Sequence, residues 1–370
     1  WVVRRMHEER KKILTMLKNG EISIDEANAL LEELEKVQTE KTRKEDYLMY
    51  EVSPVFEQES TREKRGGKSF LATATDKLSS LIGTAAKKIK EMDLDFYHSV
   101  SFDHVLQTNE TDFSKIDINI PFGSTTIHVW DADEVRAECK VKVYRTETLE
   151  EGKKKFSKDV SLKKEEDTLS FISREKFMKV DVQFYFPRKY YERISVQLLN
   201  GDIEVETFRA EKWKCKTING KVRLAECHGD EGELETGNGV IILTHNQFKD
   251  LEAETLNGKI NVDGSFHKLD LKSITGTINA TVTNQDVDTI RLESGTSPLY
   301  VTIPPDIPVY GEVQSFLGSF YVELDDVHIS DVVKETVQKI AKFERGITGE
   351  QQPLFIYAES KTGSIFIKQS

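Results

Sequence analysis

The chain has 370 residues, of which 38% are hydrophobic and 31% are charged, so it holds enough apolar material for a folded core. Its 52 basic and 64 acidic residues give a net charge of −12, which argues against general nucleic-acid binding because such binding needs clustered cations. Three cysteines are too few for a disulfide framework, and no apolar run approaches the ~18–20 residues of a membrane span or forms the core of a signal peptide.

The first patterned segment, residues 6–36, is predicted to be a small helical hairpin. Ile13 and Leu17 recur at helical spacing before an Asn-Gly stop. Ser23, followed three residues later by Glu26, is a capping box that satisfies the free N–H groups at the start of a second helix. Two helices of this size bury little apolar surface, so we expect the hairpin to dock on a partner or to self-associate.

Residues 37–68 are rich in Lys, Glu, Arg, Thr and Gln and are predicted to be a flexible charged linker. Residues 69–92 then place apolar side chains in one helical stripe, with five lysines against one aspartate between 68 and 90. A basic amphipathic helix of this kind suits an anionic membrane surface, and the alternative is a helix packed on the protein's own β-domain or in a coiled assembly. The predicted contact residues are Phe70, Leu78, Leu81, Ile82, Ile89, Lys77, Lys87, Lys88 and Lys90.

The dominant signal in residues 93–370 is a repeat with a period of about 19 residues. Asn-Gly or Thr-Gly pairs recur with their glycines 19, 19, 19 and 18 residues apart. Apolar residues stand at fixed distances from each pair and alternate with polar ones, as in strands with one buried side. A fixed period near 20 predicts a stacked solenoid. The pairs are Asn200-Gly201, Asn219-Gly220, Asn238-Gly239, Asn257-Gly258 and Thr275-Gly276.

Asn-Gly is also the best two-residue hairpin signal, so an antiparallel meander is the competing fold. An antiparallel meander would rarely keep the same residue type at the same position of five successive units, so the repeat favours the solenoid. In a solenoid each Asn lies over the Asn of the rung below, so we expect a ladder of amide hydrogen bonds and a positive φ at the corner glycines. We therefore predict a mainly β protein, with a right-handed β-solenoid over 93–370 preceded by a helical hairpin and an amphipathic helix.

The period loosens outside the regular repeat. A Ser-x-x-Gly motif that begins at Ser273 recurs at Ser315 and Ser360, which predicts further rungs separated by longer insertions. One insertion, Asp331 to Phe343, is predicted to be a helix from its apolar spacing. Upstream, the alternation from Ile116 to Val129 resembles a first rung.

No catalytic constellation stands out, because the sequence has no phosphate-binding glycine loop, no His-Glu-x-x-His and no Cys-x-x-Cys motif. Cys227, His228 and His245 lie in one corner and have the ligand types of a soft-metal site, but a solvated corner is the favoured interpretation. Cys215 falls in an inward column and Cys139 in a strand with Val141 and Val143, and both are interpreted as buried apolar residues. A polysaccharide-cleaving solenoid enzyme remains as an alternative, although an acidic body would repel a polyuronate substrate. We expect no enzyme activity, cofactor or metal.

The order of these segments resembles the YvlB/LiaX group of Bacillota proteins. The helix motif runs Leu17-x-x-Gly20-x-Ile22-Ser23-x-x-Glu26-Ala27-x-x-Leu30-Leu31. Lys87 to Phe96, followed by the glycine-punctuated solenoid, resembles the adhesin-like domain of the same group. The resemblance covers the chain from Met6 onward and is closer to YvlB-like members, because LiaX-type members are longer. It implies a non-enzymatic protein of the envelope-stress response, often encoded beside phage-shock-type membrane proteins.

LiaX-type relatives are associated with the cell surface and with sensing cationic antimicrobial peptides. Together with the residues, the resemblance predicts a cytoplasmic, membrane-peripheral scaffold whose basic helix contacts anionic lipid or a phage-shock-type membrane protein. Its acidic body would attract cationic peptides. The alternative is an adhesin at the cell surface, exported without a classical signal peptide, that binds glycan or peptide along the solenoid.

Overall fold

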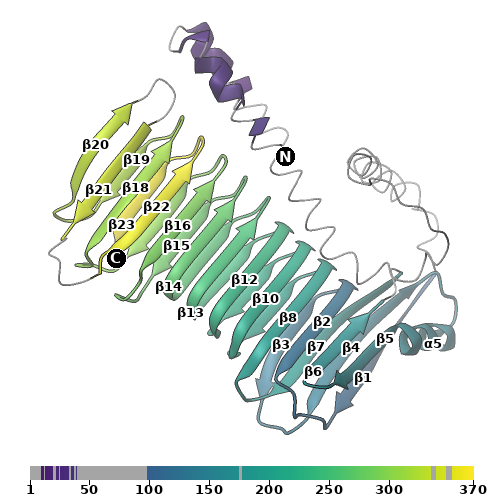
Figure 1. The fold of residues 1–370 in the computed structure, drawn as a ribbon. Helices are drawn as coiled ribbons and strands as arrows, with labels where there is room; N and C mark the ends of the chain where they lie inside the picture. The colour runs from purple at the N-terminus through teal and green to yellow at the C-terminus, as the bar shows by residue number, and fades with distance from the viewer. Residues whose placement is uncertain are drawn as a thin grey trace, which may run out of the picture.

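The computed structural model describes residues 10–11, 13–19, 22–24, 26–32, 35–36, 39, 98–174, 177–334, 339–346 and 352–370 (Figure 1). Within these ranges the chain is mainly β, with 23 strands and the helix α5 (Leu149–Asp159), preceded by short helical stretches between residues 10 and 39. The predicted basic helix 69–92 and nearly all of the predicted linker 37–68 lie outside the described residues.

The 19-residue units form a parallel, two-layered solenoid, as predicted, and not an antiparallel meander. Each unit contributes one strand to a first layer and, after the Asn-Gly turn, one strand to a second layer. Cys215 pairs in parallel with Val196 on one side and with Leu234 on the other, which is the register of a stack with one rung per period. The strands of these units are β8 (Tyr191–Asn200), β9 (Ile203–Glu206), β10 (Ala210–Asn219), β11 (Val222–Ala225), β12 (His228–Asn238), β13 (Ile241–Thr255), β14 (Ile260–Ser273) and β15 (Ile278–Val282).

The rungs at both ends are stacked out of chain order. The last rung, β22 (Leu354–Ser360) and β23 (Ile365–Gln369), lies between the rung of β16 (Thr289–Ser294) and β17 (Leu299–Ile303) and the rung of β18 (Val309–Ser315) and β19 (Phe320–Glu323). At the other end, β2 (Lys115–Phe122) and β3 (Thr125–Trp130) form the predicted first rung beside β8 and β9. The rung of β6 (Thr168–Ser173) and β7 (Met178–Pro187) stacks outside it.

Antiparallel strands close the two ends of the solenoid. At one end β5 (Val160–Glu165) pairs with β6, and β4 (Val135–Tyr144) pairs with both β7 and β1 (Ser99–Thr108). The ring of Phe156 on α5 packs edge-on against Phe102 of β1, with ring centroids 5.8 Å apart. Such strands cover edges that would otherwise offer unpaired backbone groups to another chain.

The predicted helix at 331–343 is wrong. At the other end of the solenoid this region contributes to β20 (His328–Lys334) and β21 (Lys339–Arg345), which pair with each other in antiparallel fashion, and β21 continues the first layer from β18. The β-branched residues of the segment favour strands, and the free edge of β18 supplies the hydrogen-bonding partner that decides the outcome.

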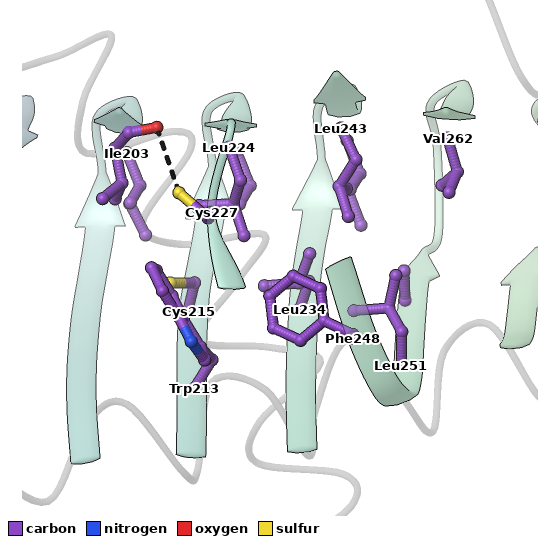
Figure 2. Close-up of a cluster of buried hydrophobic side chains, with 14 of the residues drawn as sticks. Ile203, Trp213, Cys215, Leu224, Cys227, Leu234, Leu243, Phe248, Leu251 and Val262 are labelled. Carbon is purple, nitrogen blue, oxygen red and sulfur yellow. Dashed lines mark hydrogen bonds between the residues drawn. The ribbon is translucent and has the colours of Figure 1, made fainter. Parts of the chain in front are cut away.

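The core lies between the two layers and is made of the predicted inward columns. Ile203, Cys215, Leu224 and Leu234 are fully buried, and Figure 2 shows them with their neighbours between the facing strands. Cys139 is also buried, as predicted. Alternation with a period of two therefore places the apolar residues of every rung in one continuous core.

The turn asparagines form the predicted ladder along one edge of the solenoid. Each side-chain amide donates to the asparagine of the preceding rung, and Thr275 Oγ1 ends the run by donating to Asn257 Oδ1 at 2.9 Å. A second ladder, which sequence analysis missed, consists of hydroxyls two residues before each turn that donate to the glycine carbonyl of the preceding rung. Its hydroxyl donors are Thr217, Thr236, Thr255 and Ser273, at 2.8–3.1 Å. The amide bonds are Asn219–Asn200 at 2.8 Å, Asn238–Asn219 at 2.9 Å and Asn257–Asn238 at 2.6 Å.

The turn glycines are needed for a different reason from the one predicted. Of the five, only Gly201 has a positive φ, of 155°. At Gly220, Gly239, Gly258 and Gly276 a Cβ atom would lie only 1.4–1.9 Å from the glycine carbonyl oxygen of the neighbouring rung. Glycine therefore permits the close approach of successive rungs. The positive φ values fall instead at the opposite corner, at Thr207, Glu226 and His245, each at 53°.

Candidate binding surfaces

The outer face of the first layer carries the polar columns of the repeat. Strands β10, β12, β13 and β14 place charged side chains of successive rungs beside one another, roughly 4.8 Å apart. An open groove of about 580 Å³ crosses these strands. Its charged lining consists of Arg193, Lys212, Lys214, Glu231, Glu233, Asp250, Glu252, Lys268, Asp270 and Arg291.

Lysines of β10 neutralise the carboxylates of β12 across this face. Each lysine forms an ion pair with the glutamate 19 residues later, at the same position of the next rung. Lys216 forms a second ion pair, with the glutamate of the neighbouring column. The exposed pairs of Lys212 and Lys214 contribute only ~0–1 kcal/mol each, whereas Lys216 is buried, with only 1% of its side chain exposed. The pairs are Lys212–Glu231 at 3.1 Å, Lys214–Glu233 at 3.7 Å, Lys216–Glu235 at 3.0 Å and Lys216–Glu233 at 2.7 Å.

The next strand, β13, adds three carboxylates, of which Asp250 and Glu254 lie in register with Lys268 and Lys272 of β14. Asp250 and Glu252 have no ion-pair partner within 4 Å in the part of the chain that the structure describes. On β12, burial raises the pKa of Glu235 to about 7, because the desolvation of its carboxylate outweighs the attraction of Lys216. We call the six outward carboxylates of β12 and β13 the acidic band. Its excess of negative charge is centred on Glu252, which lies between Glu233 and Asp270. Its members are Glu231, Glu233, Glu235, Asp250, Glu252 and Glu254.

The corner residues considered for metal binding do not converge. Cys227 Sγ lies inside the core (Figure 2). It is 3.4 Å from the carbonyl oxygen of Ala225, and burial raises the pKa of its thiol to about 12. His245 lies at the exposed corner, with Nδ1 2.9 Å from Asp263 Oδ1. Among the described residues no group of three or more His, Cys, Asp or Glu side chains has a metal-binding arrangement.

The outer face of the second layer carries a stack of three aromatic rings that sequence analysis missed. Tyr300, Phe366 and Tyr321 lie on β17, β23 and β19, and both neighbouring pairs of rings have centroids 4.9 Å apart with planes within 8°. The two tyrosines are exposed. The stack could not be found from spacing in the sequence, because it depends on the insertion of β23 between two earlier strands.

The helical hairpin docks at the same end of the solenoid, on the turn between β18 and β19. Ile13, Ala27 and Leu30 are buried, and Phe316 and Leu317 of the turn pack against them. The predicted capping box is present, since Glu26 N donates to Ser23 Oγ at 3.2 Å and the Ser23 N–H donates to the Glu26 carboxylate. The hairpin therefore uses the solenoid as its packing partner; self-association of the hairpin remains a prediction.

The predicted membrane-contact residues, from Phe70 to Lys90, all lie outside the described residues. Among the described helices, none is both long and apolar enough to cross a membrane.

A two-layered solenoid with capped ends and a docked helical hairpin defines a repeat scaffold with a separate small N-terminal module. The model of the family described as "Toastrack DUF4097" matches residues 113–321, and that of a SHOCT-like domain matches residues 8–38. The chain is 39% identical over 367 residues to "Uncharacterized protein YvlB" of Bacillus subtilis (strain 168), covering 99% of this chain and all of that one. The chain therefore belongs to the Toastrack family, in its YvlB-like group, and neither matching model is that of an enzyme family.

The solved structures that this chain resembles have low sequence identity to it and TM-scores below 0.5. One is named a "putative adhesin" from Bacteroides fragilis, with 13% identity, a TM-score of 0.41 and coverage of 75% of this chain and 99% of that one. Another, from Parabacteroides distasonis, is named a "putative lipid binding protein", with 12% identity, a TM-score of 0.36 and coverage of 72% and 96%.

Proposed function

We propose that the protein is a non-enzymatic scaffold that works at the membrane surface in the bacterial envelope-stress response. The observation that carries this proposal is the long, ordered outer face of the first layer, where Asp250 and Glu252 form no ion pair and Glu252 lies between Glu233 and Asp270. Rows of charge at a fixed spacing suit the recognition of an extended or repetitive cationic partner. Cationic peptides, including antimicrobial ones, are partners of this chemistry.

The membrane contact in this proposal is made by residues 69–92. Their apolar stripe and the local charge of +4 between residues 68 and 90, in a protein of net charge −12, support binding to anionic lipid or to a membrane protein of the phage-shock type. The acidic solenoid would be repelled by the same lipid surface, so the basic segment would hold it there while leaving its outer faces in solution.

Liposome flotation tests the membrane contact. The intact protein is expected to float with anionic vesicles at low salt, and to float neither with neutral vesicles nor at high salt. Reversal of two charges, Lys87→Glu with Lys88→Glu, removes two attractions of about 1 kcal/mol each and should weaken binding at least ~30-fold. The matched control is Lys153→Glu with Lys154→Glu on the exposed side of α5, which should leave flotation unchanged.

Two results would contradict the proposal. If neither the intact protein nor the Lys87→Glu, Lys88→Glu variant floats, residues 69–92 are a packing face and the membrane assignment is wrong. If flotation is unaffected by the Lys87 and Lys88 reversals and by salt, the solenoid itself binds lipid through another surface. The competing function, an adhesin of the cell surface, predicts no dependence on residues 69–92 and saturable binding of glycan or peptide to the solenoid alone.

A further inference from the structure

One column of the first layer's outer face is apolar, in contrast to the charged columns beside it. It is the last outward position before the turn. Its apolar members are Leu199, Ile218, Leu256, Ile274 and Phe316, with glycine at the same position within β12 and directly after β16, and Lys361 directly after β22. We call these five residues the turn-edge column. Because they alternate with inward residues such as Leu198, their side chains lie outside the main core.

Two members of this column form a hydrophobic cluster of their own. Leu256 and Ile274 are only 1% and 3% exposed, and no further apolar side chain among the described residues packs on the pair. Apolar side chains on the outside of a sheet stay buried only beneath additional chain. The column is therefore a docking surface, and the contact of Phe316 with the helical hairpin shows that one end of it is already used in this way.

We propose that residues 47–56 are a strap that lies along the turn-edge column, from Ile274 toward Leu199. Seven of these ten residues are apolar, whereas none of the next twelve, 57–68, is. The predicted flexible linker would then consist of two unlike parts. The strap extends the interface that the hairpin makes with Phe316 and follows the hairpin in the sequence after residues 37–46.

The distances agree with this path. The strand order from β18 through β22, β16 and β14 to β13 places Ile274 three rungs and Leu256 four rungs from Phe316, or about 14 and 19 Å. Tyr47 follows the docked Leu31 by 16 residues, which span roughly 24 Å even as a continuous helix. Ten extended residues reach about 33 Å, more than the four rungs, about 19 Å, between Ile274 and Leu199.

The strap would also fix where the basic segment leaves the protein. The hairpin docks at the β18 end, whereas β1 lies at the opposite end of the stack, so residues 40–97 have to return along the solenoid. With residues 47–56 held on the turn edge, the polar stretch 57–68 tethers residues 69–92 on their N-terminal side, as 93–98 join them to β1 on the other. This inference stands independently of membrane binding.

Hydrogen–deuterium exchange of the intact protein tests the strap. Amides of residues 47–56 are expected to exchange at least about tenfold more slowly than those of residues 57–68. The double variant Leu256→Asp with Ile274→Asp should abolish this difference, while strands β8 to β14 keep their protection. The control Ile242→Asp, on the outer face of the second layer, should leave the exchange of residues 47–56 unchanged.

A variant of the strap itself, Leu48→Ser with Tyr50→Ser, covers the case in which the aspartates unfold the solenoid. It should speed exchange in 47–56 and raise that of Leu256 and Ile274, without altering the rest of the core. Equal exchange of 47–56 and 57–68 in the unmodified protein would overturn the proposal. Protection of residues 47–56 that appears only at high protein concentration would also overturn the proposal, because it would mean that the turn-edge column binds residues 47–56 of a second copy.

Discussion

Replacement of one turn glycine tests how closely the rungs are packed. At Gly258 a Cβ atom would lie 1.6 Å from the carbonyl oxygen of Gly239, so Gly258→Ala must push two rungs apart. The overpacking costs about 1–3 kcal/mol. The displacement also weakens two bonds across this turn, Asn257 to Asn238 and Thr255 to Gly239, at about 0.5–1.5 kcal/mol each.

Restriction of the unfolded chain by alanine offsets about 0.4–1 kcal/mol, which leaves a net loss of roughly 2–5 kcal/mol. Thermal unfolding followed by circular dichroism should show a decrease in Tm of about 5–15 °C. The neighbouring exposed Lys259→Ala is the control and should stay within about 0.5 kcal/mol of the unmodified protein.

A further variant separates close approach from backbone conformation. Gly258→Asn should be no better than Gly258→Ala, because φ at this residue is not positive. Recovery of stability with asparagine would show that the turn needs a left-handed residue, and an unchanged Tm for Gly258→Ala would refute the close packing of rungs.

Three other predictions concern the docking turn and the acidic band. Phe316→Ala with Leu317→Asp should release the hairpin at a cost of about 2–4 kcal/mol of apolar contact, seen as loss of amide protection in residues 13–31 while the solenoid keeps its Tm; protection that survives would mean that the hairpin is held elsewhere. The pKa of Glu235, raised to about 7, means that the folded state binds more protons than the unfolded state between about pH 4.5 and 7. Stability should therefore fall as pH rises through this window, and Glu235→Gln should flatten the curve measured by urea unfolding; an unchanged curve would contradict the raised pKa. Asp250→Asn with Glu252→Gln should weaken binding of a decalysine probe about tenfold in fluorescence anisotropy at low salt, and equal affinity would remove the acidic band from the proposed function.

The regular part of the fold could be predicted because its information is local and repeated. Each unit carries its own turn, inward residues and outward residues, so the period alone defines the parallel stack and the asparagine ladder. The role of the glycines could not be predicted from a single rung, because the atom that excludes a Cβ at Gly258 belongs to the rung before it.

The irregular ends escaped prediction for a related reason. The spacing of Val333 and Ile340 fits a helix as well as a strand, and only the free edge of β18 selects the strand. Similarly, the insertion of β22 and β23 between earlier rungs brings Phe366 between Tyr300 and Tyr321. Neither of these contacts, β18 with β21 or Phe366 with the two tyrosines, can be predicted from the spacing of residues along the sequence.

The candidate surfaces were predictable to different degrees. The outward columns that form the acidic band follow from alternation, and their polar character was expected. The docking of the hairpin on Phe316 and Leu317 was not, because the prediction identified a need for a packing partner without indicating which surface supplies it.

The most direct test of the membrane-peripheral scaffold is fractionation of bacterial cells that express the intact protein or a variant lacking residues 69–92. The proposal predicts that the intact protein sediments with membranes, is released by high salt, and resists protease added to whole cells. The deletion variant should remain in the supernatant. Cleavage of either protein, intact or lacking residues 69–92, by protease added to unbroken cells would contradict the proposal and favour a surface adhesin.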